Sequence, residues 1–239
     1  MPLQAVEPQR LYRQIAEQLR SAIEAGEFAV GARLPAERDL AKQLGVSRPS
    51  VREALIALEV EAWVEVRTGS GVYVLERSGT ARVSSAELLA PAEWGPLELI
   101  RARRVVEGET AAIAAARAKR RDTDAMHKAI DSMVQDADRG MMPLEGDRAF
   151  HTAIAQAGGN SVLLETVQTF WDSRRGPVFV RLGGHFETAQ SWRAAIMEHQ
   201  AILGAIRARD APAARSAMHV HMDKAHARFS ASWRRTKRT

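Results

Sequence analysis

Within the first 75 residues, the spacing of apolar side chains changes from a helical period to a strand period. From Leu11 to Ala25, apolar residues recur at three- and four-residue intervals, which predicts a helix that ends at Gly26. Pro35 favours the first turn of a short second helix, because its fixed φ suits that position, and Gly45 ends this helix. The second helix is therefore only two to three turns long and is followed by a tight turn.

The segment after this turn predicts a third helix and then a hairpin. Ser47 is a good N-cap, and Pro49 is tolerated in a first helical turn. From Trp63 or Val64 to Val74 the apolar residues alternate, and Gly69–Gly71 interrupts them as a turn would. A helix, a short helix, a tight turn, a helix and a hairpin follow one another in a winged helix-turn-helix. A generic α+β fragment is the alternative.

The residue types at the start of the third helix favour DNA binding. Arg48 and Arg52 are four residues apart, which predicts one helical face opposite the apolar stripe. An arginine there can donate two parallel hydrogen bonds to guanine O6 and N7. The net charge of +5 does not itself indicate DNA, because residues 1–75 carry nine basic and ten acidic side chains. The placement of the arginines must provide the affinity.

Composition limits the remaining possibilities. A chain of 239 residues has room for two ordinary domains, and 46% hydrophobic residues suffice for a packed core. The absence of cysteine excludes disulfides and thiolate metal sites, so any metal must bind His, Asp or Glu. The first residues lack the apolar run of a signal peptide, and no stretch approaches a membrane span. We therefore expect a cytoplasmic protein without membrane association.

Downstream of the hairpin, the pattern predicts a linker and a mainly helical second domain. Residues 76–96 are rich in Ser, Ala, Gly and Pro, which is typical of a linker between a first domain of residues 1–75 and a second of residues 97–233. Residues 234–239 form a basic tail. The second domain carries six segments with helical periodicity, and these predict an all-α antiparallel bundle: Leu97–Lys119, Asp124–Arg139, Pro143–Ala157, Ser161–Ser173, Ala189–Arg207 and Ala211–Trp233.

Four polar residues occupy apolar faces of these helices. Asp147 and His151 are four residues apart beside Phe150, while His199 and His221 lie on the apolar stripes of later helices. Neutral imidazoles and a carboxylate from facing helices suit Zn²⁺, Ni²⁺ or Mn²⁺. From spacing alone, Asp-x3-His is a weak motif, and core histidines that are satisfied by hydrogen bonds are the favoured interpretation.

The run LPAERDLAKQLGVSRPSVREALIALE, followed by VRTGSGVYV, resembles the DNA-binding domain of the GntR family. The resemblance implies that Arg38, Arg48 and Arg52 contact DNA, that Ser47 and Ser50 hold phosphates, and that Gly69 at the wing tip approaches the minor groove. Ala62 departs from the family pattern, which usually has Gly after the recognition helix. A left-handed conformation there would favour Gly by about 1 kcal/mol.

The helical domain is similar to the FCD domain of the FadR branch of that family, through IRARRVVEGETAAIAAARA, DRAFHTAIAQAGGN, MEHQAILGAIRARD and ARSAMHVHM. The resemblance implies that Asp147, His151, His199 and His221 bind a divalent metal, Zn²⁺ being favoured over Ni²⁺ or Mn²⁺. It also implies that Arg103 faces an acidic effector. The segment QTFWDSRRGPVFVRL is similar to the subgroup that responds to hexuronates and related sugar acids, and there Arg174 or Arg175 would add a contact or would be surface arginines.

These observations predict a homodimeric repressor that binds a palindromic operator and is controlled by a small carboxylate effector. A metal-dependent enzyme acting on a sugar acid is one alternative, although the sequence shows no HExxH motif and no nucleophile elbow. A structural metal domain for protein partners is the other. We therefore expect no catalytic residue.

Overall fold

The computed structural model describes residues 10–76 and 94–231, and the chain divides into two compact units. The first unit contains the described residues up to Pro96, the segment Gly176–His185 and the described residues after Phe229. The second unit contains Leu97–Arg175 and Phe186–Phe229. Most of the expected linker and the whole basic tail lie outside the described residues.

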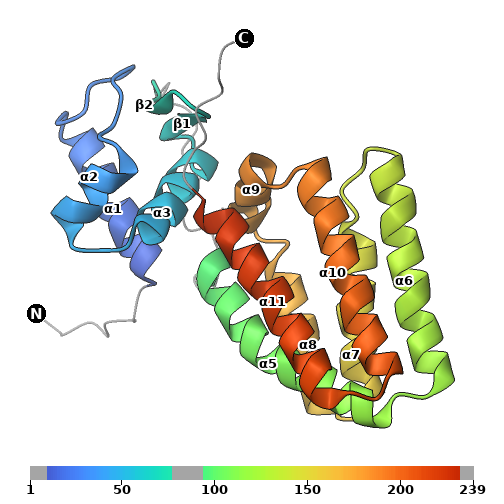
Figure 1. Cartoon of the computed structure of the whole chain (residues 1–239). Coiled ribbons are helices and arrows are strands. Elements are labelled where there is room, and N and C mark those ends of the chain that lie inside the picture. The colour runs from blue at the N-terminus through green and yellow to red at the C-terminus, as the bar shows by residue number, and fades with distance from the viewer. Residues whose placement is uncertain (1–9, 77–93, 232–239) are drawn as a thin grey trace, which may run out of the picture. The chain divides into compact units, whose positions relative to one another are not determined.

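The first unit has the element order of a winged helix-turn-helix, as the sequence predicts (Figure 1). Its hairpin is antiparallel, with Val64 opposite Val74 and Arg67 opposite Gly71. An isolated bridge joins Arg33 to Tyr73 at the edge of this hairpin. The elements are α1 (Leu11–Glu24), α2 (Glu37–Leu44), α3 (Arg48–Val60), β1 (Val64–Arg67), β2 (Gly71–Val74) and α9 (Pro177–Phe186).

Helix α3 begins and ends where local chemistry requires. The Ser47 side chain accepts a hydrogen bond from the Ser50 backbone N–H at 3.2 Å, which confirms Ser47 as the N-cap. The inner face of α3 is completely buried at Val51, Ala54 and Leu58. Just beyond its C-terminus, Ala62 has φ 58°, a left-handed conformation that favours Gly. This helix is therefore fixed at its start and slightly strained after its end.

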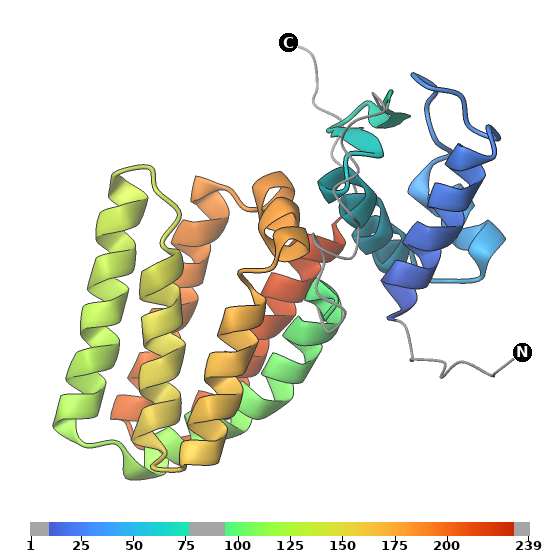
Figure 2. The same cartoon turned by 180° about the vertical axis from the view of Figure 1, so that it is seen from behind.

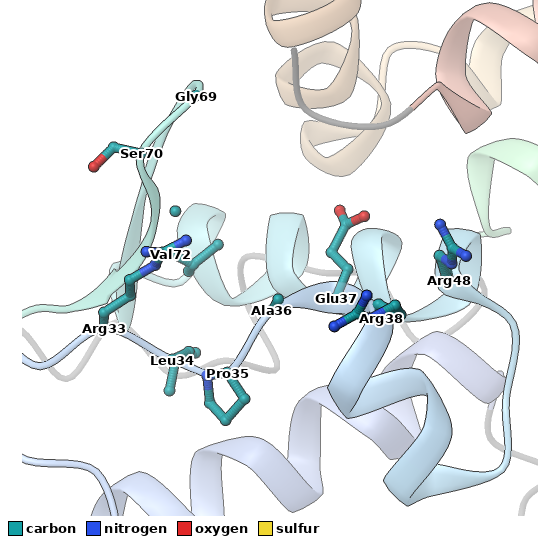
Figure 3. A pocket seen from close by; sticks show the side chains of 11 residues that line it. Arg33, Leu34, Pro35, Ala36, Glu37, Arg38, Arg48, Gly69, Ser70 and Val72 are labelled. Carbon is teal, nitrogen blue, oxygen red and sulfur yellow. The ribbon is translucent and has the colours of Figure 1, made fainter. Parts of the chain in front are cut away.

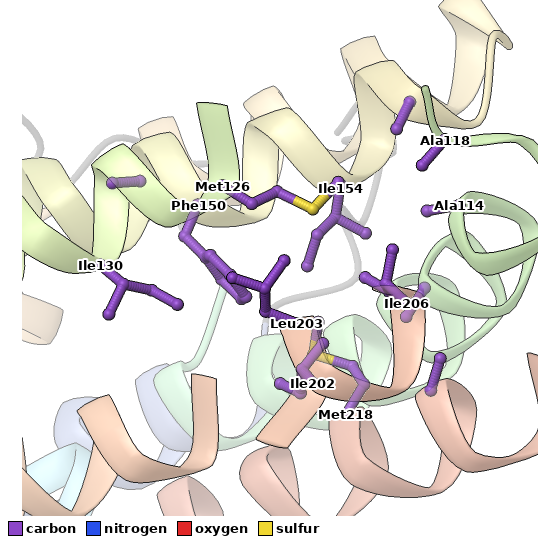
Figure 4. Close-up of a cluster of buried hydrophobic side chains, with 14 of the residues drawn as sticks. Ala114, Ala118, Met126, Ile130, Phe150, Ile154, Ile202, Leu203, Ile206 and Met218 are labelled. Carbon is purple, nitrogen blue, oxygen red and sulfur yellow. The ribbon is translucent and has the colours of Figure 1, made fainter. Parts of the chain in front are cut away.

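The second unit is a bundle of helices around a main apolar core and a smaller second cluster (Figures 1 and 2). Helix α6 packs against α7 and α10, and α7 packs against α8. Phe150, Ile154 and Ile202 are completely buried in the core that Figure 4 shows. The helices are α5 (Pro96–Arg117), α6 (Arg120–Asp138), α7 (Leu144–Ala157), α8 (Ser161–Ser173), α10 (Ala189–Arg207) and α11 (Ala211–Ser230).

Helix α9 is the one element that the sequence analysis missed. It is only ten residues long and contains the adjacent glycines Gly183 and Gly184, which weaken a helical pattern. Its residues group with the first unit, where Arg181 and His185 contact Glu59 of α3. Among the described residues, we find no helix that is both long enough and apolar enough to cross a membrane.

Candidate DNA-binding surface and metal site

The start of α3 and the wing form a concave surface of about 250 Å³ in the first unit (Figure 3). Arg38 and Arg48 both line it from the helix-turn-helix and are exposed, with 75% of the Arg38 side chain accessible. Gly69 and Ser70 line it from the hairpin. Two exposed guanidinium groups beside a glycine-rich turn suit a phosphate backbone and base edges.

Arg52 differs from the expectation that it shares an exposed face with Arg48. Its side chain is 1% exposed, and its Nε and Nη2 atoms donate to the two carboxylate oxygens of Glu37 at 2.8 and 2.6 Å. Glu37 begins helix α2, which packs across this turn of α3 and buries it. The expected exposure was therefore wrong, and in this structure the Arg52 guanidinium joins α2 to α3.

Of the other residues expected at this surface, Gly69 lines it, whereas Ser47 and Ser50 are not among its lining residues. Ser47 and Ser50 are joined by a 2.8 Å hydrogen bond between their hydroxyl oxygens, at the N-terminus of α3. Gly69 has φ 77°, which the turn requires and which other residues rarely adopt. Arg33 also lines the surface and was not singled out from the sequence. Its position depends on the bridge to Tyr73 in the wing, which no local sequence pattern indicates.

In the second unit, the structure brings together the four residues expected to bind metal. One ligand atom from each of Asp147, His151, His199 and His221 lies within 4.8 Å of all the others, and all four side chains are buried. The Nε2 atoms of His151 and His199 are 3.2 Å apart. Asp147 Oδ1 lies 3.4 Å from the first of these nitrogens and 3.3 Å from the second.

These spacings and donor types fit a divalent ion. Ligand atoms at about 2.0–2.2 Å from a common ion are separated by about 3.0–3.5 Å. Asp147 Oδ1 is buried without a hydrogen-bond partner in the described part of the chain, which is costly unless another group satisfies it. Three imidazoles and one carboxylate are borderline ligands of the kind Zn²⁺ and Ni²⁺ accept.

Burial favours the neutral, metal-binding form of two of the histidines. Burial, reinforced by His199 and His151, holds the pKa of His221 well below its ordinary value. Burial likewise lowers the pKa of His199. Although burial opposes it, the adjacent imidazoles of His151 and His199 and the positive charge of Arg174 hold the pKa of Asp147 well below its usual range.

A second group of side chains adjoins the cluster. Arg103 is buried, its Nε donates to Glu107 Oε1 at 2.5 Å, and its Nη2 has no partner among the described residues. The guanidinium groups of Arg103 and Arg174 each lie 4.4 Å from the ring centre of Trp171. Arg174 also donates to Asp147 Oδ2 at 2.8 Å.

Arg175 is not brought to this group. Its side chain is 64% exposed, and its Nη2 lies 3.4 Å from Glu145 at the surface. Of the two arginines considered from the sequence, only Arg174 therefore adjoins the cluster.

Three carboxylate and aromatic residues near the cluster were not anticipated: Trp171, Glu107 and Glu198. Glu107 contacts His151 Nδ1, and Glu198 Oε2 lies 2.8 Å from His221 Nδ1. A Glu four residues after Arg103 and a Glu next to His199 were visible in the sequence. Only the packing of α5, α7, α10 and α11 shows which imidazole each carboxylate faces.

An exposed arginine-lined surface on a winged helix-turn-helix and a helical unit with a buried Asp-His₃ cluster define a DNA-binding transcription regulator with a separate sensing domain. The family models agree with both parts. The model "Bacterial regulatory proteins, gntR family" matches residues 11–74, and the FCD domain model matches residues 98–224. The chain belongs to the GntR family of transcription regulators, in the branch that carries an FCD domain, and is not an enzyme.

Relatives of known name match over most of the chain. The Uxu operon transcriptional regulator of Escherichia coli K12 is 35% identical, over 94% of this chain and 89% of its own length. The Exu regulon transcriptional regulator of the same strain is 36% identical, over 92% and 85%. The transcriptional repressor NanR of Klebsiella aerogenes is 30% identical, over 94% and 86%. A solved structure of E. coli McbR/YncC, 24% identical, shares the fold with a TM-score of 0.50 over 93% of this chain and 98% of that one.

Proposed function

We propose that the protein is a homodimeric repressor that binds a palindromic operator through residues 1–75 and senses a small sugar acid through residues 97–233. The sugar acid is a hexuronate or a related hydroxy acid, and its binding releases the DNA. The names of the Uxu and Exu regulators and of the repressor NanR support a repressor of this class.

The operator contacts follow from exposure at the concave surface of the first unit. Arg38 and Arg48 supply the direct contacts, Ser47 and Ser50 hold phosphates, and Gly69 lets the wing approach the minor groove. A homodimer would place two such surfaces on the two halves of a palindrome.

The metal would be held by Asp147, His151, His199 and His221, and we favour Zn²⁺ over Ni²⁺ or Mn²⁺. When bound, the ion supplies a Lewis acid for the carboxylate and the neighbouring hydroxyl of the effector. Arg174 orients Asp147 by donating to its Oδ2 atom, which leaves Oδ1 facing the histidines. The buried Trp171 ring contacts the guanidinium groups of both Arg103 and Arg174.

The effector proposal depends on Arg103. Its Nη2 atom is buried without a hydrogen-bond partner in the described part of the chain, and the Glu107 that Arg103 contacts also contacts His151 of the cluster. A buried guanidinium donor without a partner costs free energy that an anionic ligand would recover. A carboxylate shared between the metal and Arg103 satisfies both groups.

Operator binding across a panel of hexuronates and aldonates tests this proposal in metal-loaded protein. We expect Arg103→Lys to raise the effector concentration for half-release of the operator by about tenfold or more, because a lysine loses the forked donors. Metal content should stay unchanged. Arg104→Lys is the matched control, since Arg104 is the next residue of α5 and pairs with Asp223 at the surface. Equal midpoints for the two variants would rule Arg103 out as an effector contact.

A further inference from the structure

Two of the three histidines in the metal cluster have a carboxylate on the ring nitrogen that faces away from it. His221 Nδ1 lies 2.8 Å from Glu198 Oε2, and both side chains are buried. Since Glu198 engages Nδ1, only Nε2 of His221 remains for an ion. The Nδ1 atom of His199 has no such partner among the described residues.

The second carboxylate is Glu107, which is 1% exposed and lies against His151 Nδ1. The Nε2 atom of the same ring faces His199 and Asp147. Glu107 also accepts from Arg103, so one carboxylate joins a metal-facing imidazole to the arginine proposed to bind the effector. Burying a carboxylate is costly, and packing α5 against its neighbours does not require one.

Cations offset the charge of each carboxylate. Glu198 Oε1 lies 3.3 Å from Lys224 Nζ and 3.9 Å from Arg228, both on α11. Glu107 Oε1 accepts a hydrogen bond from the buried Arg103 guanidinium. Each carboxylate therefore lies beside at least one cation on the outer side of its imidazole.

We infer that Glu107 and Glu198 are the positioning residues of the metal site, and that Glu107 also sets the geometry of Arg103. A carboxylate that accepts Nδ1–H fixes the tautomer in which Nε2 carries the lone pair, and it makes that nitrogen a better ligand. Glu198 therefore acts on the metal through His221 alone. Glu107 acts on the metal through His151 and on the effector through Arg103. The effector part of this inference rests on the proposed function of Arg103.

The test measures Zn²⁺ affinity of the metal-stripped full-length protein against a chromophoric chelator, and the absorption spectrum of its Co²⁺ form. We expect Glu107→Gln and Glu198→Gln each to weaken Zn²⁺ binding by about 10–100-fold and to shift the Co²⁺ bands. Glu109→Gln is the matched control, because Glu109 lies on α5 but pairs with Arg215 at the surface. The Zn²⁺ affinity of Glu109→Gln should stay within twofold of that of the wild type.

Thermal unfolding of the metal-free proteins separates positioning from folding. If the two variants bind Zn²⁺ and Co²⁺ like the wild type and only their metal-free stability falls, the carboxylates are structural and the inference is wrong. If the wild type itself binds neither ion, the metal part of the proposed function fails as well.

Effector binding separates the two carboxylates. The readout is the concentration of D-glucuronate or D-galacturonate that releases half of the bound operator at saturating Zn²⁺. We expect Glu107→Gln to raise this concentration at least tenfold, while Glu198→Gln leaves it within threefold of the wild type. Equal midpoints for both variants would overturn the link between Glu107 and Arg103 without affecting the positioning of the imidazoles.

Discussion

Arg48 and Arg52 are separated by one helical turn on α3, yet their environments differ. Arg48 is exposed at the concave surface, whereas Arg52 is buried against Glu37. Sequence spacing places both on one face of the helix, but it does not show that α2 covers only the second of them. We therefore propose that Arg48 contacts the bases, whereas the Arg52 side chain joins α2 to α3.

For Arg48, the expected effect of Arg48→Ala is on DNA alone. Losing a forked contact to a base edge should weaken operator binding by about 1–3 kcal/mol and relax base preference at one position of each half-site. Fluorescence anisotropy with the operator and with single-base variants measures this. Lys42→Ala, an exposed change on α2 away from the concave surface, serves as the control. Unchanged affinity and base preference in Arg48→Ala would contradict the assignment.

For Arg52, the expected effect is on folding. Arg52→Ala leaves the Glu37 carboxylate without its two-point partner at the α2–α3 contact, and breaking a buried pair costs about 3–5 kcal/mol. Amide hydrogen exchange of the α3 peptides should show this loss of local stability. Arg38→Ala, at a largely exposed side chain, should change the opening free energy of the same α3 peptides by less than about 0.5 kcal/mol. Wild-type protection in Arg52→Ala would show that the pair contributes little.

At the scale of elements, the sequence predicted those helices whose signals are local. Ser47 as an N-cap and the apolar face of α3 required only neighbouring residues. Helix α9 was missed because adjacent glycines interrupt it and because its apolar residues cover fewer than three turns. The contact that holds it, between Glu59 and residues more than 120 positions later, leaves no local pattern.

The Asp-His₃ cluster shows the same division. Its four residues were predicted from the resemblance to the FCD domain, and the structure brings them together. Glu107 and Glu198 were missed because a carboxylate on a helix face is ordinarily a solvated charge. Only tertiary packing distinguishes these two from the exposed Glu109.

The α3–α9 contact should make stability depend on pH. Burial alone would raise the pKa of Glu59, but hydrogen bonds from His185, Arg181 and the Val66 backbone lower it from 4.5 to about 2. A carboxyl group with a depressed pKa in the folded state stabilises that state above its unfolded pKa. This contribution is present above about pH 4.5 and is lost as the pH falls toward 2.

Urea unfolding of the full chain between pH 3 and pH 6 measures this contribution. We expect Glu59→Gln to lower the free energy of unfolding by about 2 kcal/mol at pH 6 and by progressively less toward pH 3. Glu65→Gln, at an exposed residue of β1, should show no such trend. A difference between wild type and Glu59→Gln that stays constant with pH would mean that the charge of Glu59 does not stabilise the fold.

At the scale of the whole molecule, the proposed DNA surface and the proposed effector site lie in different units, so any coupling between them is a property of the entire chain. An effector that releases the operator must bind more weakly when the operator is present, and by the same factor. We expect this factor to correspond to about 1–3 kcal/mol. Calorimetric titration of a hexuronate into the metal-loaded protein, with and without a saturating operator duplex, measures it. Identical affinities would show that the two sites are not linked.

Helix α9 has a consequence for how such regulators diversify. The first unit is assembled from two stretches of sequence, because Arg181 and His185 lie about 120 residues after the Glu59 that they contact. A single recombination event between residues 76 and 94 would join an α3 from one parent to an α9 from the other. Exchanging the complete first unit between two regulators therefore requires either two crossovers or parents that already share this contact. The segment that must be inherited together for operator binding thus extends beyond the first consecutive domain of the sequence.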